Sequence, residues 1–161
     1  MAFVPGDALD PKHLEVVPPF TAANAPSGPA PDLRSLTSLN PLRGRVSAIH
    51  ASSFFHLFSE EKQLYLARAL AGLLSPEPGS MIFGLQIGVA KKGFTPLAMG
   101  GDHRLFCHSP ESWALVWDGP VFEKGVVVVQ AKLVQVERKH FEGGEAPAQP
   151  VSVLVWSVTR S

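Results

Sequence analysis

Three side chains near the middle of the chain could bind a metal ion. His103, Cys107 and His108 offer the imidazole nitrogen and thiolate sulfur that zinc prefers. The adjacent pair Cys107 and His108 chelates poorly, and no fourth ligand accompanies the three. The spacing therefore argues against a metal centre, and we predict none.

The composition sets wider limits on function. A single cysteine excludes both an intrachain disulfide framework and a zinc site built on paired cysteines, and it is typical of a reducing compartment. The 14 basic side chains balance the 14 acidic ones, which leaves no electrostatic footprint for nucleic acid or an acidic membrane surface. The sequence has neither a long apolar run nor a signal-peptide pattern at its N-terminus. We expect a cytoplasmic protein with neither nucleic-acid nor membrane partners.

The first 45 residues differ in composition from the rest of the chain. Eight of the 15 prolines lie there, and each proline fixes φ and removes a backbone donor, which opposes helices and central strands. We predict that residues 1–45 form an extended segment with one turn near 33–39. Loops of this length are usually functional or disordered.

Beyond residue 45 the pattern becomes regular. Residues 46–49 read as a short strand, and apolar residues at helical spacing after the N-cap Ser59 predict a helix over 60–74. Residues 81–87 are apolar at nearly every position, which is typical of a strand covered on both faces. This order of strand, helix and strand indicates a parallel sheet.

The second half predicts three further elements. A glycine-rich loop over 93–101 leads to a short helix over 110–118, which begins after the cap Ser109. Strands over 126–137 and 151–159 follow without a helix between them, so we expect an antiparallel pair. The predicted class is α/β, with an open sheet that ends in an antiparallel hairpin.

Within the predicted α/β domain, residues 46–161, several motifs occur in one order. They are 45–58 (RVSAIHASSFFHLF), 73–80 (LLSPEPGS), 108–113 (HSPESW) and 155–158 (VWSV). In that order they resemble the fourth strand and its loop, the turn into the fifth strand, a late helix and the last strand of fungal small-molecule methyltransferases. Those enzymes are class I, S-adenosylmethionine-dependent proteins of polyketide and meroterpenoid pathways.

The resemblance implies a partial Rossmann-like sheet with strands four to seven. In the family the sheet order is 3-2-1-4-5-7-6, and a Gly-x-Gly turn after strand one lets the backbone approach the cofactor. Phe3 and Val4 resemble the end of strand three, so the N-terminal strands and that turn are expected to be missing. The strand at 46–49 would then lie at an open edge, which is a template for pairing with another chain. We expect a homodimer joined near this strand, or a complementing subunit.

The resemblance also implies where S-adenosylmethionine would bind. Asp7 and Ala8 would lie near the adenine end of the cofactor, in the loop that leaves strand three. His50, Ala51 and Ser52 would lie at its methionine end. The alternative for Asp7 is a turn aspartate that accepts hydrogen bonds from the local backbone.

A second group of residues would serve the small-molecule substrate. Phe54, Phe55 and Trp113 would contact it, and His56 would act as a base if the acceptor must lose a proton, since imidazole titrates near neutral pH. Core packing is the alternative role for the aromatic residues, and a structural histidine is the alternative for His56.

The sequence therefore predicts a truncated methyltransferase-like protein that acts on a small molecule and needs dimerisation or a partner to complete its cofactor site. Two alternatives stay open, because the glycine turn is missing and the cofactor could have been lost with it. One is a non-catalytic remnant of the fold that serves as a binding or scaffolding subunit. The other is a methyltransferase-like scaffold reused for a different small-molecule reaction.

Overall fold

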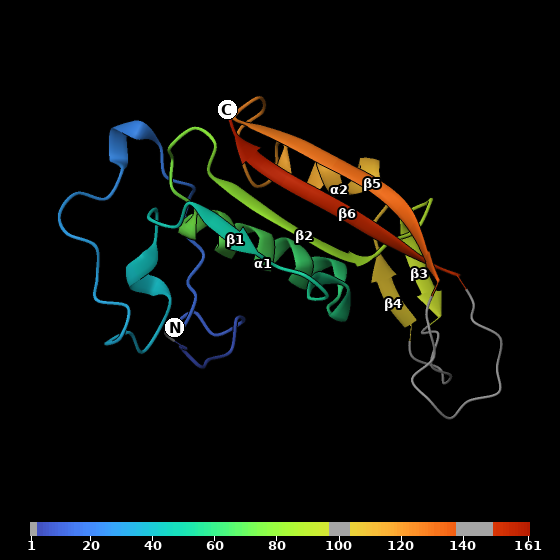
Figure 1. The fold of residues 1–161 in the computed structure, drawn as a ribbon, viewed down its shortest axis with the longest axis horizontal. Coiled ribbons are helices and arrows are strands. Elements are labelled where there is room, and N and C mark those ends of the chain that lie inside the picture. The colour runs from blue at the N-terminus through green and yellow to red at the C-terminus, as the bar shows by residue number, and fades with distance from the viewer. Residues whose placement is uncertain (1–2, 97–103, 138–149) are drawn as a thin grey trace.

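A computed structural model describes residues 3–96, 104–137 and 150–161 of the chain (Figure 1). Its elements in chain order are the 3₁₀ helices η1 (Ala22–Asn24) and η2 (Asn40–Leu42), strand β1 (Ala48–His50), the 3₁₀ helix η3 (Phe55–Leu57), helix α1 (Glu60–Leu73), strands β2 (Met81–Ile87), β3 (Gly93–Pro96) and β4 (Arg104–Cys107), helix α2 (Pro110–Trp117), and strands β5 (Val127–Glu137) and β6 (Pro150–Arg160).

The main sheet has four strands in the order β1-β2-β6-β5. β1 and β2 are parallel, with Ile49 opposite Ile82, whereas β6 is antiparallel to both of its neighbours. The predicted α/β class and the antiparallel pairing of the last two strands are confirmed. The mixed sheet is compatible with a partial Rossmann-like fold, and β1 lies at one edge of it.

The first strand begins later than its sequence pattern predicts. β1 covers Ala48–His50, while Val46 makes an isolated parallel bridge with Leu74. The hydrogen-bonded ladder with β2 therefore starts two residues beyond the start of the apolar run. The other predicted elements of the main sheet and both α-helices agree with the structure to within one residue at each end.

The glycine-rich loop expected over 93–101 is wrong at its first residues. Gly93–Pro96 forms β3, which pairs antiparallel with β4 in a separate two-stranded sheet. Phe94 stands opposite Phe106, and their rings meet edge to face with centroids 5.4 Å apart. This aromatic pair favours the hairpin. Gly100, Gly101 and His103 lie outside the described residues.

Both α-helices begin at the predicted caps, but the two caps differ. Ser109 and Ser112 form a capping box at α2, in which each side chain accepts a hydrogen bond from the other residue's backbone N–H. Ser59 has the extended backbone of an N-cap, yet its side chain makes no capping hydrogen bond. The start of α1 is instead favoured by Glu60 and Glu61, whose charges suit the helix dipole.

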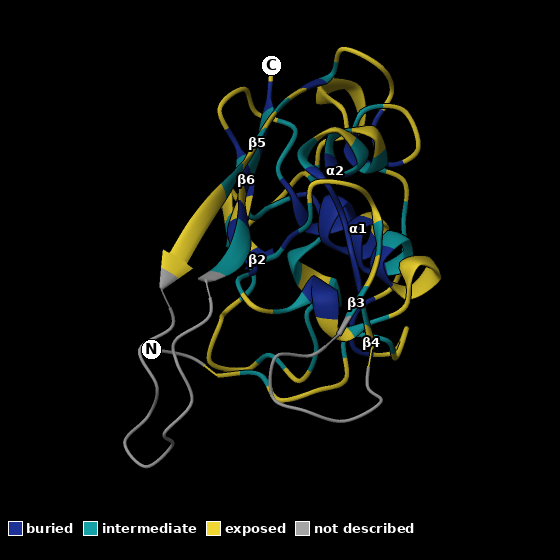
Figure 2. Ribbon diagram, turned by 90° about the vertical axis from the view of Figure 1, so that its right-hand side faces the viewer, coloured by how far each residue is buried: buried dark blue, intermediate teal, exposed yellow. Residues whose placement is uncertain are grey.

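The helices lie on one side of the main sheet, and Figure 2 shows that the other side carries neither. Between the layers lies an aromatic core, which we call the tryptophan cluster: Phe55, Trp113, Trp117, Phe122 and Trp156, each at most 3% exposed. In the part of the chain that is described, no helix is long and apolar enough to cross a membrane.

The proline-rich segment contains no strand within residues 3–45, but it packs against the α/β part. Leu14 is buried, and Val17 lies against Gly72 of α1. The Arg160 guanidinium donates a hydrogen bond to the Phe20 carbonyl and lies 5.2 Å from the centroid of the Phe122 ring. The end of β6 thus holds the segment in place.

Gly84 gives a first test of the packing around β1. A Cβ at Gly84 would collide with the Ala51 carbonyl oxygen and lie 2.7 Å from its carbon. We expect Gly84→Ala to lower the free energy of unfolding by about 1–3 kcal/mol, because backbone must move to admit the methyl group. Urea denaturation measures the change. Leu57→Ala, at a side chain that is 61% exposed, is the control, and equal stability of the two variants would contradict the close approach.

Candidate functional site

A groove of about 550 Å³ follows β1 on the side away from β2. β1 and the loop after it form one wall. The opposite wall comes from the proline-rich segment through Ala8, Leu14, Leu39 and Leu42, and α1 adds Leu70 and Leu73. The groove therefore lies where β1 has no neighbouring strand among the described residues. We call it the β1 groove.

The β1 groove brings together five of the residues that the sequence predicted for the site. They are Ala8, His50, Ala51, Ser52 and Phe54. Four of them are predicted cofactor contacts, and Ala8 meets the other three although it is some forty positions away in the sequence. The tertiary structure thus places Ala8 on one surface with the residues at the end of β1.

The polar end of the groove lies just beyond the carboxyl end of β1, where α/β proteins commonly bind ligands. The Ser52 hydroxyl oxygen lies 2.6 Å from Nε2 of His50 and accepts a hydrogen bond of 3.2 Å from the Leu85 backbone N–H. Ser52 can therefore donate its own hydrogen to His50. The next residue, Ser53, has a φ of 52°, a left-handed conformation that a serine rarely adopts.

Backbone contacts hold this loop against β2. The Ala51 N–H donates to the Phe83 carbonyl at 2.9 Å, and the Ser53 N–H donates to the Leu85 carbonyl at 2.7 Å. Gly84 lies between these two acceptors, and its lack of a side chain admits the loop. The loop that carries His50 and Ser52 is thus fixed by the sheet.

Asp7 does not line the groove, although its neighbour Ala8 does. One carboxylate oxygen of Asp7 accepts a hydrogen bond of 2.9 Å from the Leu9 backbone N–H. This is the local turn contact that the sequence left open as an alternative. A contact between Asp7 and a cofactor stays a prediction.

Phe55 and Trp113 lie together, but away from the groove. Both are fully buried in the tryptophan cluster, with ring centroids 4.9 Å apart and planes at 73°. Neither lines the β1 groove. Their predicted contact with a substrate stays a prediction, and their packing in this structure is that of core residues.

His56 follows Phe55 in η3 and is 8% exposed. Its Nδ1 has no hydrogen-bond partner among the described residues, and burial lowers the pKa of the imidazole. His56 is therefore neutral at pH 7, the state that a base requires. Its access to a bound acceptor stays a prediction.

The far wall of the groove was not predicted from the sequence. Leu14, Leu39 and Leu42 belong to the segment that was predicted as extended chain with one turn near 33–39. Leu14 is 1% exposed. The available signal was the presence of isolated leucines among prolines, which indicates a segment that packs rather than one that is fully solvated.

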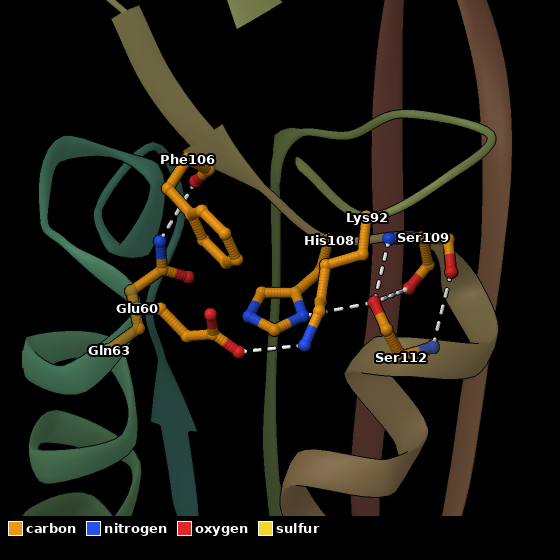
Figure 3. Close-up of polar contacts among 7 residues, drawn as sticks. All are labelled: Glu60, Gln63, Lys92, Phe106, His108, Ser109 and Ser112. Atoms are coloured by element: carbon orange, nitrogen blue, oxygen red, sulfur yellow. Dashed lines mark hydrogen bonds and ion pairs between the residues drawn. The ribbon is translucent and has the colours of Figure 1, made fainter. Parts of the chain in front are cut away.

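A second buried imidazole lies at the junction of β4 and α2 (Figure 3). Nδ1 of His108 is 3.0 Å from the Ser112 hydroxyl, whereas its Nε2 has no partner within the described residues. Burial lowers the pKa of His108 to about 4. The nearby Glu60 carboxylate opposes this shift, and Lys92, paired with Glu60 at 2.8 Å, adds to it.

The neighbouring Cys107 is buried, and burial raises the pKa of its thiol to about 11. The thiolate that a metal or a nucleophilic reaction requires is therefore disfavoured at neutral pH. Across residues 3–96, 104–137 and 150–161, no three histidine, cysteine or acidic side chains are grouped to hold a metal ion.

Comparison with known proteins gives two similar fungal sequences. O-methyltransferase phiE of Fungal sp. (strain ATCC 74256) is 36% identical over 89 residues, which are 54% of this chain and 29% of that protein. Asnovolin E/Chermesin D methyltransferase nvfJ of Aspergillus novofumigatus (strain IBT 16806) is 34% identical over 79 residues, 49% of this chain and 28% of that protein. No family model matches the chain.

The matched stretches span less than a third of the length of these curated relatives. Both relatives are named as methyltransferases. The resemblance to fungal small-molecule methyltransferases that the motifs predict is therefore confirmed, and the chain is methyltransferase-like.

Proposed function

We propose that this chain contributes to the transfer of a methyl group from S-adenosylmethionine to a small molecule, and that the β1 groove is its cofactor site. The observation that carries the proposal is the meeting of Ala8 with His50, Ala51 and Ser52 in one groove. The similarity to two fungal methyltransferases supports the same reaction class.

The residues of the groove fit such a cofactor. Its volume of about 550 Å³ lies within the range of small-molecule sites. No lysine or arginine lines it, so the positive sulfonium would meet no like charge. The apolar walls suit an adenosine group, while His50 and Ser52 supply the few polar atoms that orient a ligand.

Methyl transfer to an oxygen forms a C–O bond and breaks the C–S bond, with the electron pair of the C–S bond returning to sulfur. When bound, the cofactor supplies the activated methyl group. The protein's contribution is mainly to orient the acceptor and exclude water. We propose that Phe54 shapes the acceptor side, that Phe55 and Trp113 support it from the core behind Phe54, and that neutral His56 takes the proton of a hydroxyl acceptor.

The strand order of the main sheet supports a second part of the proposal, which concerns the position of this chain within the methyltransferase fold. We propose that β1, β2, β6 and β5 correspond to strands four, five, seven and six of the methyltransferase sheet. Ala48 and His50 alternate with the residues of β1 that bond to β2, so their backbone groups point to the open edge. A second copy or a complementing subunit would complete the site there.

The test is titration calorimetry of the full chain with S-adenosylmethionine. We expect a dissociation constant below about 100 μM, which is roughly 5.5 kcal/mol of binding free energy. Ala8→Leu, which places extra atoms in the groove, should weaken binding at least tenfold. Ala25→Leu, at an exposed position outside the groove, should bind like the unmodified chain.

A second candidate is a non-catalytic binding or scaffolding subunit. One observation favours it: no glycine lines the β1 groove, whereas the backbone approach to a nucleotide in Rossmann-like folds uses glycine. Absence of heat at millimolar S-adenosylmethionine, with both variants folded, would reject cofactor binding by this chain and support that alternative.

A further inference from the structure

The sheet face opposite the helices is apolar and uncovered within the described residues. In Figure 1 this face is toward the viewer, with α1 and α2 behind it. The large apolar side chains that project from it and are at least 36% exposed are Phe83, Leu85, Val128, Val134, Val136 and Val155. They come from β2, β6 and β5, which are neighbours in the sheet, so they form one patch. We call it the open face.

The open face is comparable in size with the largest apolar patches on monomeric proteins. The six side chains expose on the order of 400 Å², within the range of the largest patches on monomers, which are often functional. Met81, Ile87 and Val153 are half-buried on the same face. They extend it toward the roughly 800 Å² per partner that a standard interface buries.

The larger polar residues of the open face lie at its sides, whereas the smaller Ser157 and Thr159 lie on the interior strand β6. Lys132 and Gln130 project from the edge strand β5, and His50 projects from the edge strand β1. Lys132 and His50 are the titratable side chains at the described strand positions of this face, and none of these positions is acidic. A mainly apolar centre with charged and larger polar groups at its sides is the usual anatomy of a protein interface.

The shape of the open face favours contact with the same face of a second copy. Ser157 lies between Phe83 and Gln130 in one cross-strand row, and the small serine leaves a hollow of about 520 Å³. The adjacent row carries Leu85 and Val155, which project beside this hollow. A two-fold interface needs such projections and hollows on the same patch.

We propose that a second copy of this chain docks on the open face, so that two sheets pack face to face. Both α-helices of the copy are committed to its own core, so the surface that it offers is the same open face. The formal net charge of zero gives no long-range repulsion between copies. Sheets commonly pack this way, about 10 Å apart.

Docking on the open face is separate from completion of the cofactor site at the edge of β1, and it does not depend on methyl transfer. His50 belongs both to the β1 groove and to one side of the open face. A docked copy would therefore border the groove without occupying the open edge of β1. Assembly and cofactor binding are read by separate measurements, so the failure of one is distinguishable from the failure of the other.

Analytical ultracentrifugation of the full chain tests the proposal at micromolar concentrations. The unmodified 17.3 kDa chain should sediment as a dimer of twice that mass. Leu85→Lys, on the open face, should weaken dimerisation at least a hundredfold and sediment as a monomer. Leu115→Lys is the matched control, because Leu115 is 68% exposed on α2, on the other side of the sheet, and it should remain a dimer.

Two further variants keep the result unambiguous. Val155→Lys should also give a monomer, and near-ultraviolet circular dichroism from the tryptophan cluster should be unchanged in every variant. Ala48→Pro removes the backbone donor at the open edge of β1 and should leave the dimer intact. A monomeric unmodified chain, a dimeric Leu85→Lys variant that is folded, or dissociation by Ala48→Pro alone would each overturn docking on the open face.

Discussion

Phe55→Ala is expected to lower the free energy of unfolding by about 3–5 kcal/mol, the usual cost of removing a fully buried phenylalanine. Phe55 is 0% exposed, and its ring contacts those of Trp113 and Trp156 edge to face, with centroid distances of 4.9 and 5.8 Å. The truncation removes these contacts and leaves a cavity at the centre of the tryptophan cluster. The loss is a large fraction of the total stability of a typical domain.

Urea denaturation followed by tryptophan fluorescence measures this effect. Phe94→Ala is the matched control, because Phe94 is 68% exposed on β3, and its truncation should change stability by less than about 1 kcal/mol. If Phe55→Ala proved as stable as Phe94→Ala while losing cofactor-dependent activity, Phe55 would be a substrate contact and not a core residue.

Acidification from pH 7 to pH 4 is expected to destabilise the protein by about 3 kcal/mol through His108 alone. The pKa of His108 is about 4 in the folded chain, because burial disfavours the charged imidazole, and about 6.5 when it is exposed. Between these values the unfolded chain binds the proton and the folded chain does not. Stability is therefore full above the unfolded pKa and falls as the pH drops toward 4.

Chemical denaturation at a series of pH values tests the slope. His108→Gln, which keeps a polar side chain but cannot titrate in this range, should remove most of the loss attributed to His108. The pKa of His56 is also lowered by burial, so it adds a loss of the same sign that His56→Gln should remove. A pH profile of His108→Gln parallel to that of the unmodified chain would contradict the assignment.

The sequence predicted an element accurately wherever its apolar residues or its cap followed one clear pattern. The helical spacing in α1 and the serine cap of α2 predict elements whose bounds agree with the structure to within one residue. The hairpin of β3 and β4 was missed, because Gly93 lowers strand propensity and the pairing of Phe94 with Phe106 joins distant positions. Local patterns carry no signal for such a contact.

The candidate site also has one part that local sequence patterns predict and one part that depends on tertiary packing. His50, Ala51 and Ser52 follow a predicted strand, so their place at its carboxyl end could be predicted from the sequence. Their meeting with Ala8 depends on how the proline-rich segment packs, which periodicity does not specify, and it was expected only from the resemblance. The burial of Phe55 could not be predicted either, because adjacent aromatic residues give the same sequence pattern whether they face a ligand or the core.

The position of β6 has a consequence for the biosynthesis of the protein. β6 follows the other described strands in the sequence, yet it lies inside the sheet between β2 and β5, which are not neighbours of each other. On the ribosome, β2 and β5 emerge with one side unpaired and cannot be joined until Pro150–Arg160 has left the exit tunnel. Arg160 at the end of that strand then holds Phe20, 140 positions earlier. The nascent chain must therefore be protected from aggregation until β6 has emerged, and a stop codon ahead of β6 would remove the centre of the sheet.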